Sequence, residues 1–192
     1  MAVMFNPDGT LTRSAAASVG GLLYGNNWQK QTKDIFRNTA GFTANFLNNK
    51  LKINGDLSFR YTKDKTDTKM TPTPYSRTQG LIEYMGIDYN YMANQLAETK
   101  YLATNLYAEY AQKFAEAHDV KLMVGWNYEQ SIYDYFVIRR QNLLYKEAES
   151  IALANGTLTS TENYSKWRIA GGFFRANYGY KNRYLLEVNG RY

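Results

Sequence analysis

Apolar and polar residues alternate along several stretches of this 192-residue sequence. In residues 51–62 the odd positions include Leu51, Ile53, Leu57 and Phe59, whereas every even position is polar or charged. A period of two places successive side chains on opposite faces of a β-strand, and no helix would separate them in this way. The pattern therefore predicts extended strands that each have one apolar and one polar face.

The alternation recurs along the chain, which predicts an all-β protein with about six strands. The other stretches are residues 36–46, 102–114, 120–129, 167–180 and 184–192. The weakest is 167–180, where the adjacent residues Phe173 and Phe174 break the phase beside two glycines. Such a break next to glycine is typical of a β-bulge.

Short polar links join these stretches in pairs and have the length of hairpin turns. They lie at residues 47–50, 115–119 and 181–183. The connections 63–100 and 131–166 are much longer, and three- and four-residue spacing of apolar residues predicts short helices at 88–98 and 144–154. Tight turns at one rim and long loops at the other are typical of outer-membrane barrels. We therefore expect an antiparallel up-and-down meander, forming about six strands of a larger transmembrane β-barrel with long extracellular loops.

Residues 1–34 show no sustained period, and we expect an irregular loop segment there. Residues 35–192 then form the partial transmembrane β-barrel as three hairpins. No window approaches the ~20 consecutive apolar residues of a membrane helix, whereas a membrane-spanning β-strand needs only ~9–11 residues. The clearest alternating stretches have that length.

Aromatic residues gather near the ends of the expected strands. Those beside the short turns are Phe46, Phe114, Tyr178, Tyr180 and Tyr184, and those toward the long loops are Tyr61, Trp126 and Tyr128. Two such belts are what the interfaces of a membrane favour, although rings at strand ends also occur in soluble sheets.

Catalytic chemistry has little support in this sequence. The chain has no cysteine and one histidine, so a thiol nucleophile, a cysteine-based zinc site and a Ser/His/Asp triad are excluded or hard to assemble. The single histidine, His118, falls in an expected turn, where a solvated or turn-stabilising role is the plain interpretation. We expect no enzymatic activity, no metal and no cofactor.

The candidate substrate-binding residues are Tyr133, Tyr135, Arg139 and Arg140, which we expect in a long loop. Their rings could stack on a sugar or a base, and their guanidinium groups could hold an anion. The alternative, which we favour, is that these side chains pack the loop against the barrel rim.

The last part of the chain resembles a known family. Residues 167–192, WRIAGGFFRANYGYKNRYLLEVNGRY, are similar to the barrel stretch of SusC/RagA-type TonB-dependent outer-membrane transporters, where a Gly/Phe/Arg strand precedes a tight turn and an RYLLE strand. Residues 105–110 with 118–129 resemble the preceding hairpin of that family. Residues 27–30 with 42–61 resemble the hairpin before it, so the resemblance covers most of the chain.

The resemblance implies import of oligosaccharides or peptides across the outer membrane of a Gram-negative bacterium. The partners it implies are a SusD-like surface lipoprotein, the TonB complex acting through an N-terminal part, outer-membrane lipid and the glycan or peptide substrate, with no nucleic acid. Because six strands are fewer than the ~8 of the smallest membrane barrels, and because no plug or export signal is visible, we expect an internal barrel fragment.

A soluble β-sheet module that binds carbohydrate or nucleic acid is the alternative function. The 18 tyrosines and the net charge of +6 would suit it. Such a module needs a second layer to cover its apolar stripe. A layer of this same chain over Leu51, Ile53, Leu57 and Phe59 would therefore contradict the transporter interpretation.

Overall fold

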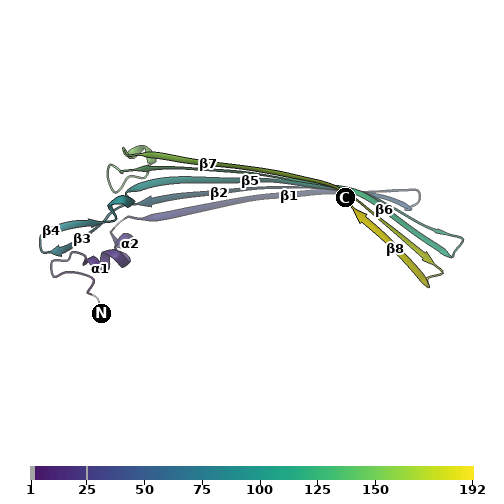
Figure 1. Ribbon diagram of the computed structural model, residues 1–192, viewed down its shortest axis with the longest axis horizontal. Coiled ribbons are helices and arrows are strands. Elements are labelled where there is room, and N and C mark those ends of the chain that lie inside the picture. Colours follow the sequence, from purple (N-terminus) through teal and green to yellow (C-terminus); the bar gives the residue numbers. More distant parts are fainter. Residues whose placement is uncertain (1–2, 25) are drawn as a thin grey trace. The chain divides into compact units, whose positions relative to one another are not determined.

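The structure is a computed structural model, and it describes residues 3–24 and 26–192. Six long strands form one sheet in the order β1-β2-β5-β6-β7-β8, and a separate hairpin joins β3 to β4 (Figure 1). The strands are β1 (Trp28–Phe46), β2 (Leu51–Met70), β3 (Thr73–Thr78), β4 (Leu81–Met85), β5 (Tyr91–Phe114), β6 (His118–Gln141), β7 (Leu158–Tyr180) and β8 (Tyr184–Arg191). The expected all-β, up-and-down meander is confirmed.

Helical structure is limited to short turns. These are α1 (Arg13–Ala15), the π-helical η1 (Ala16–Gly20), α2 (Gly21–Leu23) and the 3₁₀ turns η2 (Ile87–Tyr89) and η3 (Ile151–Leu153). The turns α1 and η1 lie next to β3, and α2 continues from η1 (Figure 1). Among the described residues, no helix is both long enough and apolar enough to cross a bilayer.

The chain forms two compact units, which we describe separately. Unit 1 contains the described residues of Met1–Asp34, Lys63–Ala97 and Asp134–Asn163. Unit 2 contains Ile35–Thr62, Glu98–Tyr133 and Tyr164–Tyr192. The alternating stretches of the sequence fall mainly in unit 2, so its strands are those that the pattern predicted.

The tight turns of unit 2 have left-handed backbone at residues other than glycine. In the β5–β6 turn Ala115 and Glu116 have φ of 46° and 55°, and in the β7–β8 turn Lys181 and Asn182 have φ of 50° and 54°. Two successive residues with positive φ are typical of a type I′ turn, whose twist matches that of antiparallel strands. The amide of Lys181 also donates to the carbonyl of Ala117 at 2.7 Å, which ties these two turns together.

The two long connections are present but shorter than predicted, because strand occupies most of residues 63–100 and much of residues 131–166. The strand β2 continues to Met70 and β5 already begins at Tyr91, which leaves residues 71–90 as the connection, and β6 and β7 leave only residues 142–157. The predicted helix at 88–98 is a single 3₁₀ turn followed by strand, and the one at 144–154 is reduced to η3. Residues 63–69, in the extension of β2, are all polar and carry no period of two. In the extension of β6, residues 131–141 mix apolar and polar side chains without strict alternation.

The first 34 residues also differ from the irregular segment that we expected. Residues 13–23 are helical, and β1 begins at Trp28, before the boundary placed at residue 35. The same physical reason applies, because residues 29–34 are all polar and hide the start of the strand.

Every buried apolar side chain among the described residues belongs to unit 1. One cluster consists of Leu11, Ala15, Ala16 and Tyr75, and another of Met92, Leu143, Ala148 and Ala154. The described part of unit 2 therefore has no hydrophobic core of its own. It is a single layer of sheet.

The bulge expected at Phe173 and Phe174 is absent from the pairing of β7 with β8. The register runs without a shift from Phe173 opposite Arg191 to Tyr180 opposite Tyr184. The two rings project to opposite faces, Phe173 toward Gly125 and Phe174 toward Gly190. The break in the sequence pattern marks an aromatic ring on each face of the sheet, each covering a glycine of a neighbouring strand.

Candidate functional site

One face of unit 2 carries exposed large apolar side chains. We call it the apolar face, and it includes Phe36, Phe42, Phe46, Leu57, Phe59, Leu106, Phe114, Leu122, Val124, Trp126, Phe174, Leu186 and Val188. The side chain of Leu57 is 48% exposed and that of Phe59 is 37% exposed. No second layer of the described chain seals the stripe, so the arrangement that would have contradicted the transporter interpretation is not found.

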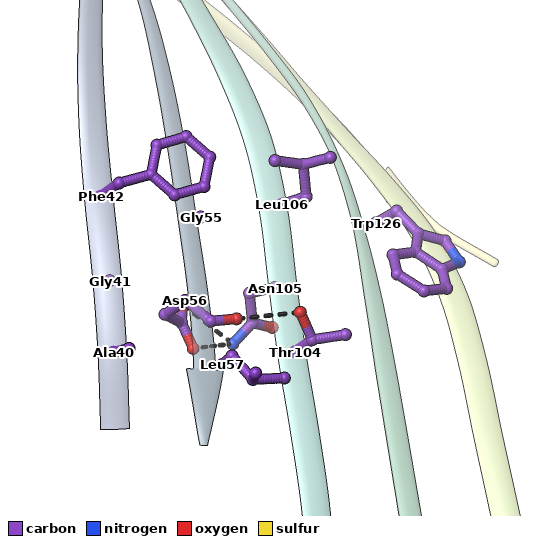
Figure 2. Close-up of a pocket in the computed structure, with 10 residues that line it drawn as sticks. All are labelled: Ala40, Gly41, Phe42, Gly55, Asp56, Leu57, Thr104, Asn105, Leu106 and Trp126. Carbon is purple, nitrogen blue, oxygen red and sulfur yellow. Dashed lines mark hydrogen bonds between the residues drawn. The ribbon is translucent and has the colours of Figure 1, made fainter. Parts of the chain in front are cut away.

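A shallow groove of ≈ 350 Å³ lies on the apolar face over Gly55 (Figure 2). Phe42, Leu106 and Trp126 are among the side chains that line it. The hydroxyl of Thr104 on this face donates to the backbone carbonyl of Asp56 at 2.9 Å (Figure 2). This bond satisfies a polar group that would otherwise cost free energy in an apolar environment.

The opposite face of unit 2 is mainly polar, and Trp167, Ile169 and Leu185 also lie on it. We call it the polar face, and it includes Arg37, Thr39, Thr43, Asn54, Asp56, Ser58, Arg60, Asn105, Lys121, Glu129, Arg175 and Glu187. Hydrogen bonds cross between neighbouring strands on this face: Thr39 with Ser58 (2.9 Å), Thr43 with Asn54 (2.8 Å) and Asn105 with Asp56 (3.0 Å). The sheet thus separates its two kinds of side chain as the alternation predicted.

Aromatic and charged groups meet on the polar face in a cluster that the sequence did not reveal. Tyr101 donates a hydrogen bond of 2.9 Å from its hydroxyl to the carboxylate of Glu129. The guanidinium carbon of Arg60 lies 5.1 Å from the centre of the Tyr101 ring, and Trp167 meets that ring edge-on at 6.3 Å. The cluster offers a cation, a carboxylate and ring faces, which suit binding by stacking and hydrogen bonding.

Tyrosines mark both ends of the apolar face. At one end Tyr61 donates to Glu98 at 2.6 Å, and Tyr128 stacks on Trp126 with ring centres 6.0 Å apart. At the other end Tyr178 shares a hydrogen bond of 2.6 Å with His118. His118 is the first residue of β6 rather than a turn residue, and it stabilises this end of the sheet.

The length of the apolar face matches a bilayer. In β2 it runs from Leu51 to Tyr61. At ~3.3 Å per residue and a tilt of ~45°, such a segment spans roughly 23 Å, close to the ~25 Å apolar band of outer-membrane barrels.

The four predicted substrate-binding residues all lie in β6, not in a loop. Tyr133 belongs to unit 2, whereas Tyr135, Arg139 and Arg140 belong to unit 1. The guanidinium carbon of Arg139 lies 3.6 Å from the centre of the Tyr91 ring, and Arg140 donates to the carbonyl of Gly156 at 3.4 Å. The two arginines thus contact neighbouring parts of unit 1.

A charged pocket of ≈ 520 Å³ lies in unit 1. Asp67 lines it, and two polar side chains hold its carboxylate. Lys65 approaches the carboxylate to 2.8 Å and Asn94 donates to it at 2.6 Å. Partial burial raises the pKa of Asp67, but these two hydrogen bonds and the charges of Lys65 and Lys30 outweigh it, and the pKa lies below its ordinary value.

We expect Asp67→Asn to destabilise unit 1 only while Asp67 would be ionised. Because its folded pKa is lowered, the loss is full above the ordinary value of 3.8 and disappears as pH falls through the lower folded pKa. Thermal unfolding of both proteins from about pH 2 to pH 7 measures this. The control is Asp64→Asn, whose exposed partner Gln31 can still donate to the new amide oxygen. A difference that did not change with pH would contradict the assignment.

No protein-family model and no curated protein matches the sequence, but solved structures match its fold. A chain of the RagAB peptide transporter superposes on 94% of this chain with a TM-score of 0.75 and 14% identity. The RagAB peptide importer gives a TM-score of 0.70 over 94% at 14% identity in its open-open state, and 0.65 over 85% at 13% in its closed-closed state.

The sheet has the fold of a segment of these transporter chains. This chain spans 19% of the first of them and 18% of the other two, which is less than a fifth of their length. At such low identity the similarity establishes the fold alone.

Proposed function

We propose that this chain forms part of the barrel wall of a SusC/RagA-type TonB-dependent outer-membrane importer. The apolar face of unit 2 contacts lipid and the polar face lines the lumen. The observation that carries the proposal is an uncovered apolar face, as long as a bilayer is thick and bordered by tyrosines. The fold similarity to the RagAB chains supports it. In hydrocarbon a sheet must be closed so that all backbone groups are paired, which is why a wall segment needs further strands.

The proposed cargo is a peptide or an oligosaccharide, and the chain makes or breaks no bonds in it. Arg60, Tyr101 and Trp167 on the polar face supply lumen contacts for such a molecule. Tyr133, Tyr135, Arg139 and Arg140 stay proposed contacts nearer the extracellular end. A SusD-like lipoprotein would meet the extracellular segments of unit 1, and the TonB complex would act through an N-terminal part of the importer.

The soluble binding module has less support. It requires a layer that covers the apolar face, and the described part of the chain supplies none. Nucleic-acid affinity that fell steeply with added salt would favour it.

Single cysteine substitutions test the proposal, because the chain has no cysteine of its own. We expect Asn105→Cys and Lys121→Cys to react with a water-soluble maleimide in outer-membrane vesicles opened to the reagent. We expect Leu106→Cys and Leu122→Cys, each one residue further along, to be protected from it and to be quenched by a lipid-dissolved nitroxide when they carry a fluorophore. Each pair is its own control for local flexibility. Equal labelling of both members of each pair would contradict a lipid-facing side.

A further inference from the structure

One end of the apolar face contains an arginine that is held in a fixed orientation. The Nε of Arg168 donates to the side-chain oxygen of Gln130 at 2.7 Å, and that oxygen also accepts from the hydroxyl of Tyr128 at 3.1 Å. Tyr128 in turn stacks on Trp126. These contacts place the guanidinium group of Arg168 directly beside Trp126 and Tyr128, the aromatic pair at this end of the apolar face. All of these residues belong to unit 2.

A second positive charge lies on the same face. Lys166 precedes Arg168 by two positions in β7, so both side chains project to the side of the sheet that carries Phe174. Both residues are exposed. Within the described part of the chain, no salt bridge connects either of them to a carboxylate.

The hydrogen bond at Nε uses one of the five N–H donors of Arg168, so donors on the terminal nitrogens stay available for a further partner. A guanidinium group presents paired donors that match the oxygens of a phosphate, and a nearby lysine adds a second charge. The apolar surface begins at the next aromatic pair, so an anion bound here would have apolar protein surface beside it. A phosphate that carries acyl chains gains from both surfaces, whereas a soluble phosphate gains from the charges alone.

We propose that Arg168 and Lys166 bind the phosphate of an anionic lipid head group at the membrane surface, with the Trp126–Tyr128 pair against the upper part of its acyl chains. This site rests on the proposed function, because it requires the apolar face to contact a bilayer. The hydrogen bond that Arg168 donates to Gln130 keeps the guanidinium at the border of that face.

Lipid retention by the full-length protein tests the site. The protein is reconstituted in vesicles of phosphatidylcholine with added phosphatidylglycerol, transferred to mild detergent, and its bound lipids are counted by native mass spectrometry. We expect the wild type to retain phosphatidylglycerol preferentially. Near a membrane surface each Lys or Arg changes such an equilibrium about fivefold, so the double variant Arg168→Gln/Lys166→Gln should lose most of the retention. Arg168→Lys, which keeps the charge but not the paired donors, should retain an intermediate amount.

The matched control removes the same charge from the other side of the sheet. Lys121→Gln/Arg175→Gln alters two exposed residues of the polar face, and it should retain phosphatidylglycerol as the wild type does. Equal retention by both double variants would overturn the head-group site while leaving the cysteine-labelling result intact. Displacement of the lipid by inorganic phosphate alone would assign the charges to a soluble anion and also overturn it. If the protein failed to insert into lipid vesicles, the head-group site and the proposed function would both be overturned.

Discussion

Leu106→Arg should destabilise the membrane-embedded protein by about 2–4 kcal/mol, the range for a cation placed in the middle of the lipid-facing band of a barrel. Leu106 lies within the apolar stretch of β5, and its side chain is 47% exposed beside the groove of the apolar face (Figure 2). If the apolar face contacts lipid as proposed, that exposed area faces acyl chains, which cannot solvate a guanidinium group.

The neighbouring substitution Asn105→Arg provides the control. Asn105 projects to the polar face and bonds to the carboxylate of Asp56, so an arginine there meets an acidic partner. We expect its effect to stay within about 1 kcal/mol, as at other solvated positions. Urea-induced unfolding of both variants in lipid vesicles measures the difference. Equal destabilisation by the two arginines, or a larger effect at position 105, would show that the apolar face does not contact lipid.

Gly125→Val should destabilise unit 2 by about 1–3 kcal/mol, as overpacking of a well-filled site does. A Cβ at position 125 would overlap the ring of Phe173 and lie 2.7 Å from the Cβ of Tyr107. The ring could rotate away, but the Cβ of Tyr107 is fixed by the backbone of β5, so the strands themselves must shift.

Substitutions at Gly55 and Gly172 are the controls, because they distinguish this steric effect from the general effect of replacing a glycine in a strand. At Gly55 the three nearest atoms all belong to the ring of Phe42, which is exposed and free to swing outward. At Gly172 the nearest atom is 3.8 Å away, an ordinary contact. We therefore expect the loss to be largest for Gly125→Ala, smaller for Gly55→Ala and within about 0.5 kcal/mol for Gly172→Ala. Chemical denaturation of the folded protein ranks them, and equal losses would contradict the packing at Gly125.

The alternation predicted unit 2 because two different environments act on its two faces. Leu57 and Asp56 are neighbours in sequence but lie on opposite faces, and this difference is visible in the sequence itself. Residues 63–69 in unit 1 form equally regular strand, yet both of their faces are polar. Pairing with neighbouring strands holds them extended, and a single strand's sequence does not show its partners.

The sequence predicts the face of the sheet on which the candidate site lies, but not which residues meet there. Alternation assigns Arg60 and Trp167 to strands, and Tyr101 directly precedes another alternating stretch, but the register between β2, β5, β6 and β7 decides which of them meet. A register shift of one residue would move each ring to the other face. The usable signal was an aromatic residue in the polar phase of its strand. At Phe173 this signal predicts a bulge, whereas in the structure the ring covers Gly125.

The tight turns of unit 2 also limit how the number of strands in a barrel wall can change. Each one returns the chain to the rim from which it came, so two strands are added or removed as one piece. Gain or loss of a whole hairpin leaves the direction of every other strand unchanged, which fits the even strand numbers of bacterial outer-membrane barrels. Loss of a single strand would reverse the direction of all later strands and carry their connections to the opposite side of the membrane. Duplication of hairpins is therefore the simplest route to a barrel of larger circumference.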